Sequence, residues 1–177
     1  TTGLTSPIKA VEVAWLVISD QMEVLDEHVY RVNPYAPIEE GASAIHGIYD
    51  KDIADCPSLE DVIKPIPSPM IAIGHNVVFD IRVLGEHLYL TGDLCTLALA
   101  RRFIHNTTNH KLQTLREELN LPVAKAHSAL GDCHTTLHLL KHLSNLCGRD
   151  LPSMVETYST PKLLTRMPFG KHKGQLF

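Results

Sequence analysis

The segment from Ala10 to Ile18 constrains the fold more than any other, because it is dense in residues that favour β-strands. These strand formers are Val11, Val13, Trp15, Leu16, Val17 and Ile18. A short apolar run of this kind is typical of a strand buried in a sheet. His28 to Val32 alternates polar and apolar side chains, which predicts a second, half-buried strand. We therefore expect a sheet in the first part of the chain.

Helical patterns dominate the remainder, after one more short apolar strand at Met70 to Ile73. Helices are expected at Ser58–Ile63, Val78–Leu88, Leu94–Phe103, Asn109–Leu119 and Ser128–Leu146. The last of these carries one apolar stripe, made by Leu130, Cys133, Leu137, Leu140 and Leu143. This alternation of strands and helices predicts an α/β fold.

Length and composition fit a single globular domain with a short appendage. The chain has 177 residues, of which 44% are hydrophobic and 20% are charged. No apolar run approaches the roughly 20 residues that a membrane helix needs. The cysteines form no C-x-x-C pair and no zinc-like spacing, so we expect reduced thiols in a cytoplasmic protein; they are Cys56, Cys95, Cys133 and Cys147.

The charge is distributed unevenly along the chain. The net charge is −4, yet residues 160–177 contain four basic side chains and no acid, so the rest of the chain carries −8. An acidic body can still act on nucleic acid when its carboxylates hold divalent cations, because the cations invert the local charge. The basic tail either contacts phosphates or is simply a solvated terminus, and charge alone favours neither interpretation.

Two carboxylates occupy positions where a site can form. Asp80 closely follows the Met70–Ile73 strand, and ligand-binding groups of α/β proteins are found at such strand ends. His127 and Asp132 form an H-x4-D pattern at the start of the last long helix. Taken alone, the His127–Asp132 pair is better explained by an ordinary first-turn Asp that complements the helix dipole, and an Asp at a helix N-terminus such as Asp80 is also common.

Other charged residues receive weaker interpretations. His134, His138 and His142 are spaced at i, i+4 and i+8, which allows zinc binding as a minor alternative to a solvent-facing stripe. Glu12, Glu117 and Glu118 are not expected to be catalytic.

Several segments together resemble the DnaQ-like exonucleases of the DEDDh type. Ile73 to Asp80 resembles their second motif, H-N-x-x-F-D, and His127 to Asp132 resembles their third, H-x4-D. Thr1 to Leu4 resembles the end of the first motif, D-x-E-T-T-G-L. Three further segments are similar and follow the family's order: Ala10–Ala14, Ala42–Ile48 and Thr96–Arg102. Met167 to Gly174 resembles the segment that follows the nuclease domain in the exodeoxyribonuclease X subgroup.

The resemblance implies a ribonuclease H-like fold, with a mixed central sheet flanked by helices. It places an exonuclease domain at residues 1–148 and a basic C-terminal extension, the start of an exodeoxyribonuclease X-type tail, at residues 149–177. The implied activity is metal-dependent 3′→5′ hydrolysis of DNA, which releases nucleoside 5′-monophosphates during repair or proofreading.

The resemblance also assigns roles to individual residues. Asp132 and Asp80 would bind two Mg²⁺ or Mn²⁺ ions, and His127 would be the general base. Thr2 and Gly3 would offer backbone N–H groups to the terminal nucleotide of single-stranded DNA or a DNA 3′ end, and Leu4 would wedge against its base. His46 and Asn76 have two equally expected roles: they contact the substrate, or they only make local hydrogen bonds within their loops.

One departure from the family pattern concerns the first motif. Its Asp and Glu would fall three residues and one residue before Thr1. Two hypotheses follow: these acids are encoded upstream, or the protein is a non-catalytic nucleic-acid-binding module on the same fold. We favour the first, because the motif lies on the family's central strand and removing that strand would leave its neighbours with unpaired edges.

Overall fold

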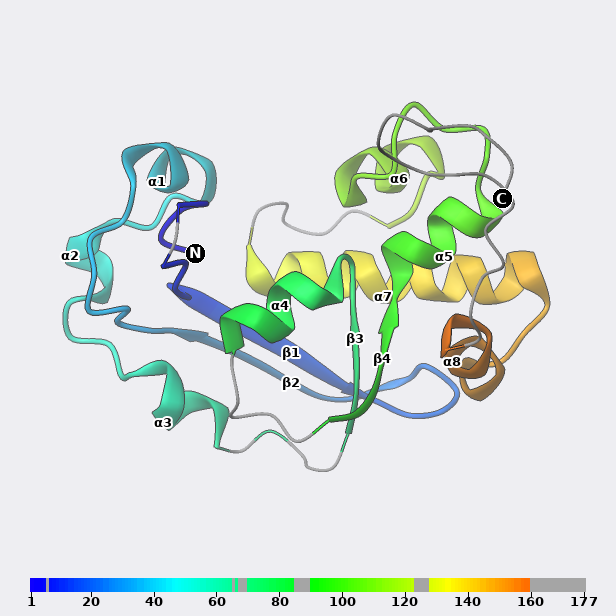
Figure 1. Cartoon of the computed structure of the whole chain (residues 1–177), viewed down its shortest axis with the longest axis horizontal. Coiled ribbons are helices and arrows are strands. Elements are labelled where there is room, and N and C mark those ends of the chain that lie inside the picture. Colours follow the sequence, from blue (N-terminus) through cyan, green and yellow to red (C-terminus); the bar gives the residue numbers. More distant parts are fainter. Residues whose placement is uncertain (6, 65, 67–69, 85–89, 123–127, 160–177) are drawn as a thin grey trace, which may run out of the picture.

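The computed structural model describes residues 1–5, 7–64, 66, 70–84, 90–122 and 128–159 (Figure 1). Its strands are β1 (Glu12–Ile18), β2 (Val24–Arg31), β3 (Met70–Gly74) and β4 (Leu90–Cys95). Its helices are α1 (Glu40–His46), α2 (Asp50–Ile53), α3 (Leu59–Ile63), α4 (Val77–Leu84), α5 (Thr96–Phe103), α6 (Leu112–Glu118), α7 (Ala129–Cys147) and α8 (Leu151–Ser159). The order confirms the expected α/β class.

The strands form one antiparallel and one parallel pair, so both orientations of a mixed sheet are present. β1 pairs with β2 in antiparallel register, with Trp15 opposite His28, and β3 pairs with β4 in parallel register, with Ala72 opposite Asp93. Within the described residues these are two separate two-stranded sheets, and β1 and β3 are each paired on one side only.

One hydrophobic cluster joins both strand pairs to α7, which lies parallel to the long axis of the molecule (Figure 1). Leu16 of β1 and Ile73 of β3 pack against this core. Its fully buried residues include Leu94, Leu99, Leu115, Leu139, Leu140, Leu143 and Met154. Burial of each such leucine contributes about 1.5–3 kcal/mol, so this core fixes α7 against the sheets.

The expected stripe on α7 is confirmed in part. Leu137, Leu140 and Leu143 are buried, and Leu130 and Cys133 are half-buried. Leu139 lies outside the expected stripe yet is fully buried. The reason is that α7 packs against β1 and also against α5 and α6, so more than one face of the helix is covered.

Strand β4 was not expected, and the helix predicted at Leu94–Phe103 is confirmed except for its first two residues. Leu94 and Cys95 end β4, and the helix begins at Thr96. Gly92 and Asp93 are poor strand formers, so the parallel pairing with β3 supplies the strand. The helix expected at Asn109 also starts later, at Leu112.

Helix α8 packs on β4 and places Leu151 and Met154 in the core. The expected division at residue 148 stays a prediction. The four cysteines are free thiols, as expected. Among the described helices none has the length and apolar character to cross a membrane.

Candidate active site

Asp80, after the end of β3, and Asp132, at the start of α7, both lie near the side chain of Cys133. Asp80 is in the first turn of α4, and Asp132 is in the first turn of α7. Both carboxylates act on the thiol of Cys133: burial, and then the negative charges of Asp80 and Asp132, raise its pKa to about 12. The two acids, about 50 residues apart in sequence, therefore both influence one side chain, and their joint role in a site stays a prediction.

The segment between β3 and α4 sets the position of Asp80. Asn76 has a left-handed backbone (φ 73°), which turns the chain sharply from the strand into the helix. Although Asp80 reaches the surface, nearby protein atoms displace water from its carboxyl group, and this desolvation raises its pKa from 3.8 to about 6.

The start of α7 is held by side chains from two other places. Ser128 caps the helix by accepting the Gly131 N–H (3.2 Å), and Glu12 of β1 accepts the Ala129 N–H (2.8 Å) through Oε1. Asp132 is half-buried, and its Oδ1 accepts a bond from Gln113 Nε2 at 2.9 Å. Sequence reasoning gave Glu12 no catalytic role and overlooked Gln113, because both contacts join residues far apart in the chain.

Carboxylate oxygens suit Mg²⁺ or Mn²⁺, and the donor set formed by Asp80 and Asp132 fits such an ion. Desolvation alone raises the pKa of Asp80, but a divalent cation beside it would lower that pKa again and favour the ionised carboxylate that binds metal. Among the described residues, however, no group of three or more His, Cys, Asp or Glu side chains gathers into a complete metal site. Asp80 and Asp132 thus do not make a complete metal site with other described residues, and their role as metal ligands stays a prediction.

The first residues of the chain lie beside this site. Thr1 lies near Glu12, the residue that accepts the Ala129 N–H at the start of α7. Thr2 is buried, and its N–H donates to the Lys9 carbonyl (2.8 Å), so within this structure that N–H is already used. Leu4, in contrast, is 82% exposed, as an apolar wedge for a base would have to be.

Gly3 and Glu39 are packed closely together. The Glu39 carboxylate group occupies the space that a Cβ atom at Gly3 would need. A larger residue at position 3 would therefore displace Glu39. This packing alone explains a glycine at position 3, independently of the nucleotide contact expected for Gly3.

For His46, the structure favours local hydrogen bonding. Its Nδ1 accepts the Ile48 N–H (3.1 Å), so Nε2 donates to the Thr1 carbonyl (3.1 Å). Both ring nitrogens are therefore used to tie the end of α1 to the start of the chain. Asn76 is exposed beside the β3 end, and its role as a substrate contact stays a prediction.

His75, in the same motif, joins three segments next to the site. Its Nε2 donates to the His110 carbonyl (2.8 Å), and its Nδ1 lies 3.0 Å from the Thr96 hydroxyl. Burial lowers the pKa of His75, which favours the neutral ring. His75 thus fixes the loop before α6 to the end of β3.

Two expected features lie elsewhere. His127 and residues 160–177 fall outside the described residues, so the general base and the basic tail remain predictions. His134 pairs with Glu27 of β2 (3.1 Å), and no zinc-like group forms among the described histidines.

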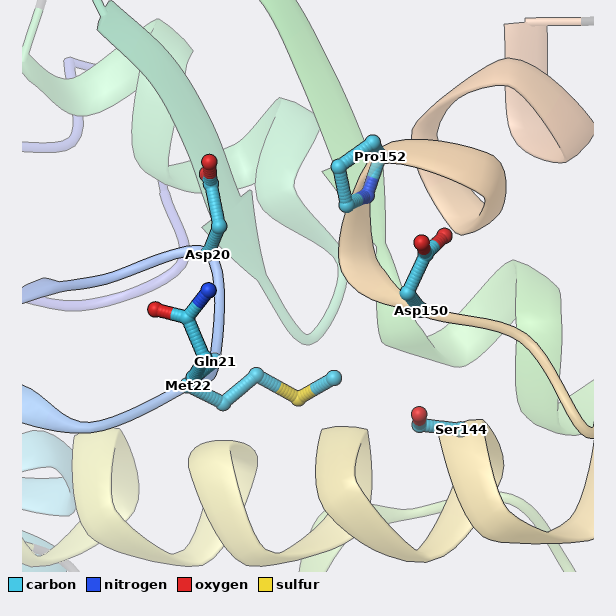
Figure 2. Close-up of a pocket in the computed structure, with 6 residues that line it drawn as sticks. All are labelled: Asp20, Gln21, Met22, Ser144, Asp150 and Pro152. Carbon is cyan, nitrogen blue, oxygen red and sulfur yellow. The ribbon is translucent and has the colours of Figure 1, made fainter.

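A pocket of about 470 Å³ lies at the far end of α7, between the β1–β2 turn and the start of α8 (Figure 2). Asp20, Gln21 and Met22 line it from the turn, and Ser144, Asp150 and Pro152 line it from the helices. Ser144 is 12 residues beyond Asp132, or about 18 Å along the helix. The pocket is lined by the carboxylates of Asp20 and Asp150 and by no basic residue, so it is unsuited to a phosphate backbone. We therefore do not include this pocket in the candidate active site.

Comparison with known proteins shows the family of this chain. The RNase_T exonuclease family model matches residues 1–140, so the chain belongs to this exonuclease family. The chain is 34% identical to exodeoxyribonuclease 10 of Escherichia coli K12 over 181 residues, which cover 99% of the chain and 79% of that protein. It is also 28% identical to the PolC-type DNA polymerase III of Oceanobacillus iheyensis, over 88% of the chain but 12% of the polymerase.

Two solved structures share the fold. One is titled exonuclease X in complex with 5′ overhanging duplex DNA; it has a TM-score of 0.72 and 32% identity, over 82% of this chain and 89% of the other. Exonuclease I has a TM-score of 0.65 at 16% identity, over 83% of this chain and 38% of its own, and shows the fold alone. The expected family and ribonuclease H-like fold class are confirmed, and a 3′→5′ DNA exonuclease is the function that these relatives support.

Proposed function

We propose that this protein is a metal-dependent 3′→5′ exodeoxyribonuclease that acts in DNA repair or proofreading in the cytoplasm. The observation that carries the proposal is that the carboxylates of Asp80, after the β3 end, and Asp132, at the α7 start, both act on the side chain of Cys133. Membership of the exonuclease family and the likeness to a DNA-bound exonuclease X support the same reading.

In the proposed mechanism, Asp132 and Asp80 hold divalent ions, Mg²⁺ or Mn²⁺, together with acids of the first motif. Two such ions, when bound, lower the pKa of the attacking water and stabilise the charge on the leaving oxygen. His127 takes the proton of the water, since an imidazole with a pKa near 6.5 is effective at neutral pH.

The substrate enters with its 3′ end first. The exposed Leu4 stacks against the terminal base without selecting its identity, and the Gly3 N–H binds the terminal nucleotide. The products are nucleoside 5′-monophosphates. Single-stranded DNA and DNA 3′ ends are the proposed substrates.

The experiment is digestion of a 5′-labelled single-stranded DNA by the full-length protein, with Mg²⁺, with Mn²⁺ and with EDTA. A ladder that shortens from the 3′ end and is absent in EDTA supports the proposal. Asp132→Asn should abolish cleavage, and His127→Ala should reduce turnover by about 10²-fold or more. Asp20→Asn, at the distant pocket, is the matched control and should retain full activity.

The second candidate is a non-catalytic nucleic-acid-binding module on the same fold. It is favoured by the incomplete ligand set among the described residues. DNA binding without cleavage under any metal would establish it, and a D-x-E sequence encoded directly before Thr1 would count against it.

A further inference from the structure

The carboxylate of Asp132 is held by a side chain from a different helix. Gln113, in α6, donates from Nε2 to Asp132 Oδ1 at 2.9 Å, and both side chains are half-buried. Helix α6 packs against α7 and lies beside its first half (Figure 1). This bond therefore connects the α6 segment directly to the candidate metal ligand.

A second bond fixes the orientation of the Gln113 amide. Arg116, one turn later, donates from Nε to Gln113 Oε1 at 2.9 Å, and its guanidinium pairs with Glu117 at 3.0 Å. Turning the amide by 180° would face its carbonyl toward the Asp132 carboxylate and its NH₂ toward the guanidinium, and both contacts would be repulsive. Arg116 thus presents the NH₂ group of Gln113 to Asp132.

We propose that Gln113 is a positioning residue for Asp132, which rests on the function proposed above. By binding one carboxylate oxygen, Gln113 holds Asp132 in one rotamer, so the carboxylate is oriented before a divalent ion arrives. Partners of this kind typically change metal affinity by about 10- to 100-fold when they are removed. Arg116 acts through Gln113 and makes the same contribution indirectly.

The first test measures Mn²⁺ binding to the full-length protein by titration calorimetry and electron paramagnetic resonance. Gln113→Leu, which keeps the volume and removes the amide, should weaken binding by about 10-fold or more. Gln21→Leu makes the same chemical change on the exposed β1–β2 turn and should leave the affinity unchanged. Gln113→Ala is a second variant, and thermal unfolding of each variant reports whether it remains folded.

A double-mutant cycle separates positioning from a general loss of structure. Arg116→Leu should weaken Mn²⁺ binding in the wild-type background but add little in the Gln113→Leu background, because Arg116 acts through Gln113. A metal-free readout comes from the Gln113 side-chain amide signals in a ¹⁵N NMR spectrum, which should shift in Asp132→Asn.

The outcomes distinguish this inference from the proposed function. If Asp132→Asn abolishes Mn²⁺ binding while folded Gln113→Leu and Gln113→Ala bind as tightly as wild type, the positioning role is overturned and the proposed function stands. Additive effects in the cycle would likewise overturn it. If the wild-type protein binds no Mn²⁺ that depends on Asp132, both proposals fail.

Discussion

Removing Glu12 should loosen the start of α7, since Glu12 joins β1 to that helix. Its Oε1 accepts the Ala129 N–H at 2.8 Å, across 117 residues of sequence, and the side chain is half-buried. A hydrogen bond to a charged group contributes about 1.5–3 kcal/mol. Because Glu12 is partly in contact with solvent, its hydrogen bond should lie near the lower end of that range. Glu12→Ala should therefore lower the free energy of unfolding by about 2 kcal/mol.

The charge and the hydrogen bond can be separated by a second variant. Glu12→Gln keeps an acceptor for Ala129 but loses the negative charge at the helix N-terminus, which should cost about 0.3–1 kcal/mol. At about 2–4 °C per kcal/mol for a chain of this size, Glu12→Ala should lower the melting temperature by about 4–8 °C and Glu12→Gln by about 1–4 °C.

The assay is thermal unfolding of the full-length protein, followed by circular dichroism, with Glu23→Gln as an exposed control. The expected order of melting temperatures is wild type, then Glu12→Gln, then Glu12→Ala, with the control equal to wild type. A Glu12→Ala melting temperature within about 1 °C of wild type would refute the contact as a stabilising link.

Two further predictions concern groups around the site. Between pH 4 and 6 the folded state holds the Asp80 proton more tightly than the unfolded state, so stability falls as pH rises through this window. A pKa of about 6 against 3.8 corresponds to at most about 3 kcal/mol, reduced to about 1 kcal/mol because Asp80 reaches the surface. Without divalent ions, Asp80→Asn should therefore melt about 2–4 °C higher than wild type at pH 7 and at the same temperature as wild type at pH 4. A variant that melts at the wild-type temperature at both pH values would contradict this prediction. Cys133, whose pKa is raised to about 12, should resist iodoacetamide at pH 8 until the chain is unfolded in urea, as followed by mass spectrometry. Labelling of the folded protein at Cys133 as fast as at Cys56 would contradict the raised pKa.

The candidate carboxylates could be found from sequence because motif and local structure coincide. Asp80 follows a strand through a tight turn, and Asp132 lies in the first turn of a long helix, so a short pattern fixes the backbone that carries each one. The core of α7 was partly predictable for the same reason: a 3.6-residue period identifies one buried face, which contains Leu137, Leu140 and Leu143.

The sequence by itself determined the α/β class, the strand β1, most of the helices and the two acids that define the candidate site. Only the tertiary structure decided that Gly92 and Asp93 lie in a strand, that Leu139 is buried, and that Glu12 and Gln113 reach the first turn of α7. The physical reason is the range of the forces involved. Periodicity and turn chemistry act within a few residues and leave a local pattern, whereas parallel strand pairing, a helix covered on several faces and hydrogen bonds across 19 or 117 residues depend on which distant segments meet.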